Sequence, residues 1–273
     1  MPSARNPQHL ATVLAAGNTP DVVLLDWAGK ALPSTALPRY RDMLQALRLI
    51  RGVVRLGGGD DFMRLEQAAL DIPGMPGPDR AIVCASPQIA AMSASLLQAA
   101  RRELTFVARN QPILFPGWSD FYNHARFSMA PAGRLLLEHA NIEGAAPAEI
   151  MDALMTALAL VAALQEAPLR YRANQMVALP WQWLANEGVP AEALGQVRCS
   201  TALRQAYDRG VDRAHELLAI AGPAHGLRGL GGWAAGTMLL TQRLLRRLQR
   251  RDFLARPVAL GLFDRLALRL ANI

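Results

Sequence analysis

Two long stretches of this chain, residues 81–100 and 153–165, carry no charged side chain. Both are rich in Ala and Leu, which are among the best helix formers. The first contains a proline, glutamines and three serines, and the second is too short to cross about 30 Å of hydrocarbon. We therefore expect two helices buried inside a helical protein and no transmembrane segment.

The composition of the 273 residues agrees, with 52% hydrophobic and 19% charged side chains. That balance excludes a disordered chain, and the scarcity of Val, Ile and Thr argues against a β-sandwich. We find no repeat and no low-complexity tract, so the chain is predicted to be one all-α domain. Hydrophobic periodicity and the Pro and Gly breaks place its helices near residues 38–55, 60–70, 87–105, 119–140, 147–165, 181–187, 200–221, 229–251 and 257–271.

Positive charge is in excess, with 29 basic against 22 acidic residues, and Lys30 is the only lysine. Arg243, Arg246, Arg247 and Arg250 recur at helical spacing and form one face of a helix. This face is either simply solvated, in a protein whose arginine content reflects a GC-rich genome, or it contacts an anionic membrane or a protein partner. Nucleic acid is not expected as a partner, because no aromatic side chains for base stacking alternate with these arginines.

Cysteine usage and the N-terminal residues indicate the compartment. Cys84 and Cys199 are too few for a disulfide framework, and residues 1–18 are polar and mixed rather than a signal sequence. We expect a cytoplasmic protein, peripheral at the inner membrane face if its arginine face contacts lipid.

Catalytic signatures are sparse. The five histidines are scattered, no Cys or His pair has zinc-ligand spacing, and the Gly57–Gly59 triplet lacks the Lys that follows it in a phosphate-binding loop. Asp60 and Asp61 are interpreted as the start of a helix, where acids satisfy free N–H groups, with metal binding as the alternative.

The second half of the chain nevertheless resembles the squalene and phytoene synthases. Leu96-Leu-Gln-Ala-Ala-Arg-Arg-Glu-Leu104 is similar to one helix of that family, and the stretch from Phe121 to Arg134 is similar to its Tyr-Cys-Arg-Tyr-Ser-x-x-Pro-Val-Gly-Arg motif. The run from Ala163 to Arg172, followed by Val177-Ala-Leu-Pro180, resembles the Leu-Gln-Asp-x-x-x-Asp-Tyr-Arg and Val-Tyr-Leu-Pro elements.

This resemblance implies the isoprenoid synthase fold, a single-domain helical bundle with a central cavity. Residues 86–273 would form the family core and residues 1–85 divergent N-terminal helices of the same domain. In the family, two aspartate-rich motifs on facing helices hold Mg²⁺ ions, which bind and ionise a prenyl diphosphate.

The chain departs from the family at the metal motifs. The second motif falls on Glu166 and Arg170, and the first falls on Arg51 and Arg55 if the helix at 38–55 is its counterpart. A guanidinium cannot bind Mg²⁺ and repels it. We therefore predict a degenerate member without a bound metal, needing Mg²⁺ only if the protein is an enzyme after all.

The remaining matches suggest a pocket. The candidate pocket or diphosphate-binding residues are His124, Arg126, Pro131, Gly133, Gln165 and Arg172. The arginines at the metal positions could bind a diphosphate directly. They could equally pair with Glu166 or Asp42 and close the pocket, which we favour because unpaired buried arginines are costly.

Three functions remain open. The first is a non-catalytic protein that works by binding, in an assembly or scaffold role, as the mitochondrial complex I assembly factor of this family does. The second is a prenyltransferase acting on farnesyl or geranylgeranyl diphosphate, alone or with a catalytic paralogue, with Asp60 and Asp61 as replacement metal ligands. The third is a carrier that holds an isoprenoid ligand without converting it.

Overall fold

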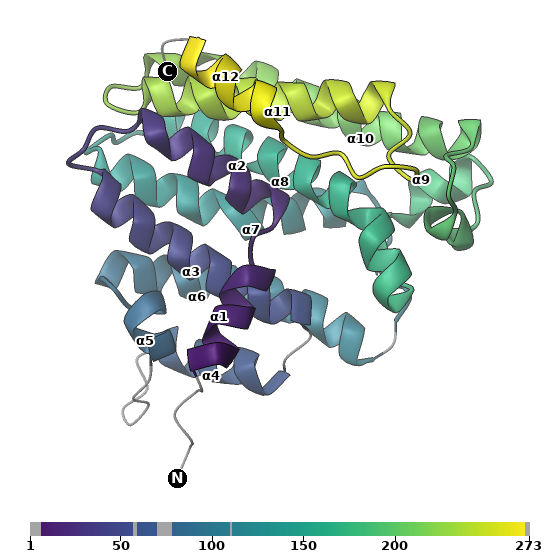
Figure 1. The fold of residues 1–273 in the computed structure, drawn as a ribbon, viewed down its shortest axis with the longest axis horizontal. Helices are drawn as coiled ribbons and strands as arrows, with labels where there is room; N and C mark the ends of the chain where they lie inside the picture. The colour runs from purple at the N-terminus through teal and green to yellow at the C-terminus, as the bar shows by residue number, and fades with distance from the viewer. Residues whose placement is uncertain (1–6, 57–58, 70–77, 110, 271–273) are drawn as a thin grey trace.

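The computed structural model describes residues 7–56, 59–69, 78–109 and 111–270. The described chain is almost entirely helical, and the predicted all-α fold is confirmed (Figure 1). Its α-helices are α1 (Pro7–Ala16), α2 (Pro20–Ala28), α3 (Leu37–Leu56), α4 (Gly59–Ala69), α5 (Pro78–Val83), α6 (Pro87–Ala108), α7 (Trp118–His139), α8 (Ala145–Asn174), α9 (Trp181–Asn186), α10 (Thr201–Ile220), α11 (Gly231–Arg250) and α12 (Leu262–Leu270). Three 3₁₀ turns, η1 (Gly29–Ala31), η2 (Ala191–Gly195) and η3 (Gly222–Gly226), connect them.

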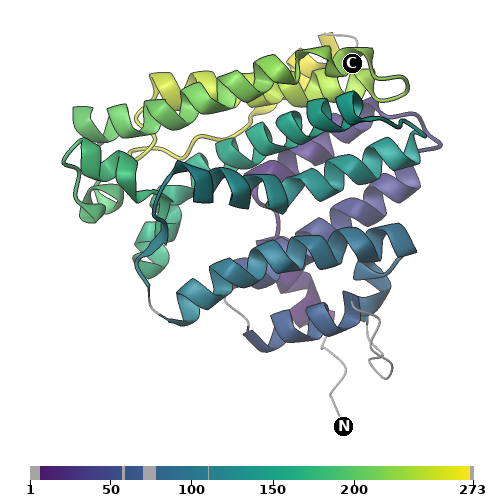
Figure 2. The same ribbon diagram turned by 180° about the vertical axis from the view of Figure 1, so that it is seen from behind.

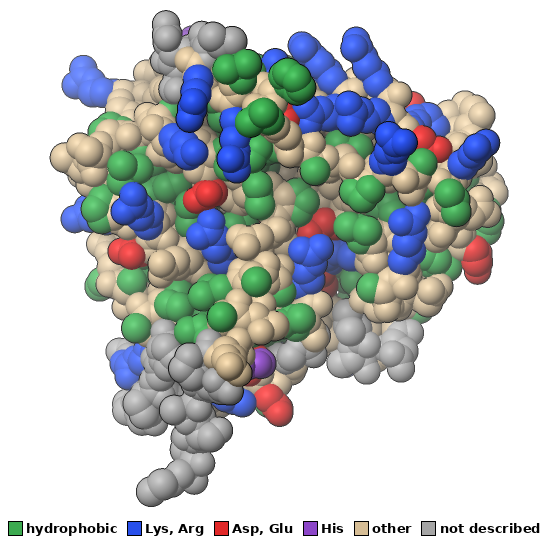
Figure 3. Space-filling model, viewed as in Figure 1, with side chains coloured by type: hydrophobic (Ala, Val, Ile, Leu, Met, Phe, Trp, Pro, Cys, Tyr) green, Lys and Arg blue, Asp and Glu red, His purple; other side chains and the backbone are tan. Residues whose placement is uncertain are grey.

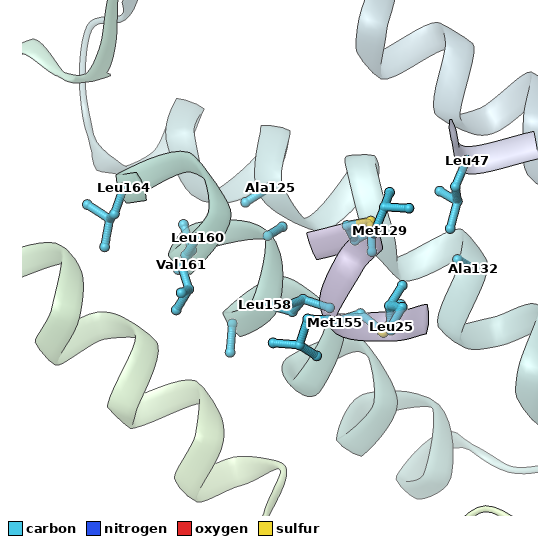
Figure 4. Packing of buried hydrophobic residues seen from close by; sticks show 14 of the residues in the cluster. Leu25, Leu47, Ala125, Met129, Ala132, Met155, Leu158, Leu160, Val161 and Leu164 are labelled. Atoms are coloured by element: carbon cyan, nitrogen blue, oxygen red, sulfur yellow. The ribbon is translucent and has the colours of Figure 1, made fainter. Parts of the chain in front are cut away.

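Helix α8 is the centre of the fold. Every residue from 151 to 162 is buried, so this helix is apolar on all sides, as a central core helix must be. Its Met155 and Leu158 pack near Leu25 of α2 and Met129 of α7 (Figure 4). Within the described residues, α8 alone is long and apolar enough to cross a membrane, but 72% of its apolar window is buried inside the protein. Its apolar character is therefore explained by the core.

The remaining helices surround α8 in layers. Seen in Figure 1, α10, α11 and α12 form the upper edge, α2, α3 and α7 lie in the middle, and α1, α4 and α5 form the lower end. The view from behind shows α6 running below α7 and α8 (Figure 2). Tyr40 of α3 joins the lower and upper parts, because its hydroxyl donates to Leu25 O at 2.6 Å and accepts from Trp233 Nε1 at 3.0 Å.

Several elements differ from the sequence expectations, among them α1 and α2, which lie where no helix was predicted. Ser119 and Asp120 do not cap α7, because Gly117 is extended (φ −142°, ψ −176°) and the helix begins at Trp118. The helix expected at 257–271 begins only at Leu262, where Asp264 Oδ2 accepts from the Gly261 N–H at 2.7 Å. The structure also contains a two-stranded parallel sheet that we did not expect, β1 (Ile113–Phe115) with β2 (Val177–Pro180).

Candidate functional site

The four positions assigned to the degenerate metal motifs face one another across the bundle. Arg51 and Arg55 lie one turn apart on α3, and Glu166 and Arg170 lie one turn apart on α8. The Arg55 guanidinium lies 3.9 Å from Glu166 Oε1, and Arg170 donates to Glu166 Oε2 at 3.3 Å. Two segments more than a hundred residues apart are thus brought into one cluster.

Two further carboxylates complete the cluster, and the sequence reasoning missed both. Asp21 on α2 accepts from Arg51 at 2.9 Å, and Glu103 on α6 accepts from Arg170. Asp21 is 2% exposed and Glu103 4%, so both are buried. Glu103 lies in the family-like run 96–104 and could have been noticed there. Asp21 precedes a short apolar stretch, with nothing in the sequence to link it to Arg51.

The cluster is therefore electrically balanced, with three arginines against three carboxylates. We name Asp21, Arg51, Arg55, Glu103, Glu166 and Arg170 the charge cluster. Pairing with Glu166 was one of the expected arrangements. Asp42, the other expected partner, forms none of the ion pairs recorded for these arginines.

His124 and Ser128 of α7 form the wall beside the charge cluster. His124 Nε2 lies 3.6 Å from Glu103 Oε2, and its ring centroid is 5.0 Å from that of Phe115. Arg51 donates to the Ser128 carbonyl at 3.3 Å. Burial, together with the nearby Arg51 and Arg102 guanidiniums, lowers the pKa of His124 to about 3. The imidazole is therefore neutral at physiological pH.

Burial also shifts the pKa values of Glu166 and Arg170, the two residues of the charge cluster that lie on α8. Burial raises the pKa of Glu166 to about 7, with Asp21 adding to the shift while Arg55 and Arg51 oppose it. One of its oxygens, Oε1, is buried without a hydrogen-bond partner. Burial lowers the pKa of Arg170 to about 10, assisted by Arg51 and Arg55. Glu166 is thus the group of this cluster that changes protonation near neutral pH.

Only a small space remains among these side chains. The cavity measures about 40 Å³, whereas pockets for small organic ligands measure about 300–1,000 Å³. Its lining residues are Thr19, Asp21, Arg51, Phe115, Phe121, His124, Ala125, Ser128, Ala159, Ala162, Ala163, Glu166, Arg170 and Ala178. The space among the side chains of the charge cluster is therefore filled almost completely in this structure.

Arg126 and Pro131 do not line this cavity but a groove between α6 and α7, where two pockets measure about 470 and 570 Å³ and His124 also lines the larger one. Arg126 donates to Asp152 Oδ2 at 2.9 Å and at 3.3 Å, and Arg134 donates to both oxygens of the same carboxylate at 2.7 and 3.0 Å. These two arginines of the family-like motif therefore tie α7 to α8.

Three other candidate residues also hold the fold together rather than lining the cavity. A Cβ at Gly133 would lie 2.6 Å from Met155 Cγ, so the missing side chain allows α7 to approach α8 closely. Gln165 donates to the Val258 carbonyl, and Arg172 donates to the Gln196 and Leu254 carbonyls at 2.9 and 3.0 Å. The hydrogen bonds from Gln165 to Val258 and from Arg172 to Leu254 attach the C-terminal segment to α8.

Asp60 and Asp61 lie at the start of α4, as expected, and away from the charge cluster. Asp61 Oδ2 lies 2.9 Å from His9 Nε2, and Asp61 Oδ1 lies 3.9 Å from an Arg64 nitrogen. Neither acid lines the cavity. Within the described parts of the chain, no group of three or more His, Cys, Asp or Glu side chains is arranged to hold a metal ion.

The arginine face of α11 is divided between two environments. Arg243 and Arg247 donate to Asp264 Oδ1 of α12 at 3.2 and 2.7 Å. Arg246 and Arg250 are exposed. Half of this face therefore attaches α12, and the other half faces solvent.

Comparison with known proteins agrees with this architecture. Residues 84–267 match the family model described as squalene/phytoene synthase. Over 124 residues the chain is 31% identical to the hydroxysqualene synthase of Zymomonas mobilis subsp. mobilis, a match that covers 45% of this chain and 39% of that protein. The aligned part is thus less than two thirds of that relative's length.

The fold also resembles two solved structures. Squalene synthase HpnC from Alicyclobacillus acidocaldarius superposes with a TM-score of 0.65 at 17% identity, over 90% of this chain and 96% of that one. A dehydrosqualene synthase in complex with ligand superposes with a TM-score of 0.68 at 16% identity, over 97% and 96% of the two chains. The similarity of fold therefore extends through the N-terminal third, which the family model does not cover.

Proposed function

Because this chain belongs to the squalene/phytoene synthase family, we propose that it is a member that acts by binding and has lost Mg²⁺-dependent prenyl transfer. One observation carries the proposal. The positions to which the family resemblance assigns magnesium ligands form a charge cluster in which each carboxylate is paired with an arginine.

The donor set of this cluster does not fit a magnesium centre. Mg²⁺ requires oxygen ligands in octahedral geometry, and the two carboxylates of each family motif lie one helical turn apart. Here the one-turn pairs are Arg51 with Arg55 and Glu166 with Arg170. Each pair contains a guanidinium that repels the cation, and Asp21 and Glu103 are each hydrogen-bonded to an arginine.

The volume of the cavity supports the same conclusion. A space of about 40 Å³ is enough for one or two water molecules and is far smaller than a prenyl chain. Opening it would separate buried ion pairs, and breaking such a pair leaves an uncompensated buried charge. The charge cluster thus acts as a structural element that closes the bundle.

A binding role in assembly or as a scaffold fits a bundle whose charge cluster is filled and whose surface is basic. Such a protein needs no cavity, because its partner contacts the exterior. The partner is a protein, either an assembly target or a catalytic paralogue. An isoprenoid ligand would instead require the charge cluster to open, with its arginines contacting the diphosphate.

The alternative is a prenyltransferase that uses farnesyl or geranylgeranyl diphosphate, alone or with a catalytic paralogue. The 31% identity to a hydroxysqualene synthase favours it, although that match spans less than half of either chain. This alternative requires metal ligands other than those of the charge cluster, and Asp60 and Asp61 lie outside the cavity.

Diphosphate release is the deciding measurement. The protein is incubated with farnesyl or geranylgeranyl diphosphate, with Mg²⁺ or with EDTA, and the hydroxysqualene synthase of Zymomonas mobilis serves as the positive control. We expect no release above the EDTA background. Release that EDTA abolishes would overturn the proposal and establish the enzyme alternative.

A second measurement distinguishes binding of a protein partner from binding of an isoprenoid ligand. The purified protein is extracted with organic solvent, and the extract is examined for isoprenoids by mass spectrometry. A stoichiometric isoprenoid would identify a ligand carrier. Its absence, together with the absence of turnover, leaves the protein partner as the target of the search.

A further inference from the structure

Helix α12 displays large apolar side chains to solvent. Leu262 and Phe263 are each 77% exposed, and Leu266 is 49% exposed. Positions 262, 263 and 266 are neighbours on one helix surface, because residues three and four apart lie side by side. Figure 3 shows apolar side chains gathered at this upper edge of the molecule, over α12. We name these three residues the apolar triad.

The helix is held firmly in place, so the triad does not simply belong to a frayed end. Asp264 is fully buried and accepts from Arg243, Arg247 and the Gly261 N–H. Leu268, on the opposite side of the helix from the triad, is buried. Two turns of α11 thus fix α12 with the apolar triad facing outward.

Exposed arginines lie on the same helix as the triad and on α11, the helix that holds it. Arg246 and Arg250 on α11 and Arg265 and Arg269 on α12 are exposed. Arg265 also lies over the Trp27 ring, 4.3 Å from its centroid. In Figure 3, blue basic side chains lie next to the apolar atoms along this edge. This edge therefore combines apolar and positively charged side chains on an exposed helix.

We propose that this edge of the molecule docks on an anionic lipid bilayer, with the apolar triad entering the headgroup region and Arg246, Arg250 and Arg269 contacting lipid phosphates. The combination is the one that interfacial helices use: apolar side chains on one surface of a helix, with basic residues flanking them. The inference does not depend on whether the protein is an enzyme.

The proposed membrane contact differs from the one that the sequence predicted. The contact predicted there consisted of the arginines of α11 alone, and two of those are already bound to Asp264. Electrostatic attraction then comes from the remaining exposed arginines, and insertion comes from α12. Neither component alone gives stable attachment, because stable membrane attachment of peripheral proteins generally needs two signals.

Vesicle co-sedimentation tests the proposal. The full chain is mixed with vesicles of phosphatidylcholine alone or of phosphatidylcholine with phosphatidylglycerol. We expect binding to the anionic vesicles only, weakened by salt. The variant Phe263→Ser with Leu266→Ser should bind at least about ten-fold more weakly, since it removes most of the inserted apolar surface. Arg246→Gln with Arg250→Gln should lose about five-fold for each arginine.

Helix α4, at the opposite end of the molecule, supplies a matched control (Figure 1). Met63 is 55% exposed and Arg64 is a neighbouring, half-buried arginine. The variant Met63→Ser with Arg64→Gln removes the same kinds of group, and we expect it to bind like the wild type. Equal loss in this control and in the α12 variants would overturn the proposal.

Insertion itself has a direct readout. Phe263→Trp keeps an aromatic side chain, and its emission should shift to shorter wavelength on anionic vesicles and be quenched by brominated lipid. Failure of the wild type to sediment with anionic vesicles would refute docking. A wild-type dimer that the Phe263→Ser and Leu266→Ser variant converts to a monomer would show instead that a second copy covers this surface.

Discussion

Arg170 illustrates how one residue can carry much of the stability of a buried cluster. Its guanidinium contacts both Glu103 and Glu166, which come from different helices. Both carboxylates are nearly inaccessible to solvent. Removing the arginine leaves Glu103 without its arginine partner and Glu166 with Arg55 alone, at 3.9 Å.

We expect Arg170→Met to lower the free energy of unfolding by about 3–5 kcal/mol, the usual cost of removing one partner of a buried pair. Urea denaturation followed by circular dichroism measures the change. The control is Arg213→Met, which breaks an exposed pair with Glu216 and should cost less than about 1 kcal/mol. Equal effects of the two substitutions would show that the charge cluster is not structural.

The pKa shifts of Glu166 and His124 have opposite effects on how the free energy of unfolding depends on pH. The pKa of Glu166 is raised to about 7, so the folded protein holds a proton that the unfolded chain releases above its ordinary pKa of 4.5. This group favours folding increasingly as pH falls from 7 to 4.5. The pKa of His124 is lowered from 6.5 to about 3, so this group disfavours folding increasingly as pH falls below 6.5.

The two contributions largely cancel between pH 4.5 and 6.5 in the wild type, and single substitutions should separate them. We expect Glu166→Gln to lose stability as pH falls below 6.5, because only the histidine remains. His124→Asn should gain stability as pH falls from 7 to 4.5. Urea midpoints measured across this range for the wild type and both variants provide the check, and parallel profiles would contradict the assignment.

At the scale of elements, the contact of α7 with α8 depends on a small side chain. Gly133 lies where a Cβ would meet Met155 Cγ at 2.6 Å and Met151 Cγ at 2.7 Å. Such approaches are closer than real Cβ atoms tolerate, so one of the helices must shift. Glycine inside a helix is otherwise unfavourable by about 1 kcal/mol relative to alanine, which makes a steric reason for it necessary.

We expect Gly133→Ala to destabilise the protein by about 1–3 kcal/mol despite the better helix propensity of alanine. Gly222→Ala is the control, because a Cβ there meets nothing within 4 Å. Thermal unfolding compares the two variants. A stabilised Gly133→Ala variant would show that the helices separate without cost.

At the scale of the whole molecule, helices of the N-terminal third are part of the same core as the rest. Leu25 of α2 and Leu47 of α3 pack in the cluster around α8 (Figure 4). The hydroxyl of Tyr40 accepts a hydrogen bond from Trp233, 193 residues away in the sequence. The charge cluster likewise joins α2, α3, α6 and α8.

We therefore expect the full chain to unfold in one transition, with coincident curves from circular dichroism and tryptophan fluorescence. A fragment of residues 86–273 should not fold stably, since it lacks the helices that cover α8. Tyr40→Phe should keep the single transition and lower the free energy of unfolding by about 1–2 kcal/mol. Two separate transitions in the full chain would show that residues 1–85 form an independent unit.

Local patterns in the sequence were sufficient for the helical class, for most helix positions and for the family. Helix periodicity and breaks depend on neighbouring residues, so the helix at 38–55 and the buried stretch at 153–165 were found correctly. The arginines at positions 51, 55 and 170, where the family resemblance predicts metal ligands, were also visible, because that comparison needs only a motif and its spacing.

The tertiary structure decided what those arginines do. Asp21 and Glu103 reach them from helices far away in the sequence, and no local pattern encodes such a contact. The same limit explains why Gln165 and Arg172, expected at a pocket, hold helices together instead. It also explains the apolar triad, because whether Leu262 and Phe263 are covered depends on which helices pack against α12. Ion pairing and burial are properties of the assembled bundle, and the sequence by itself determined only the elements from which it is built.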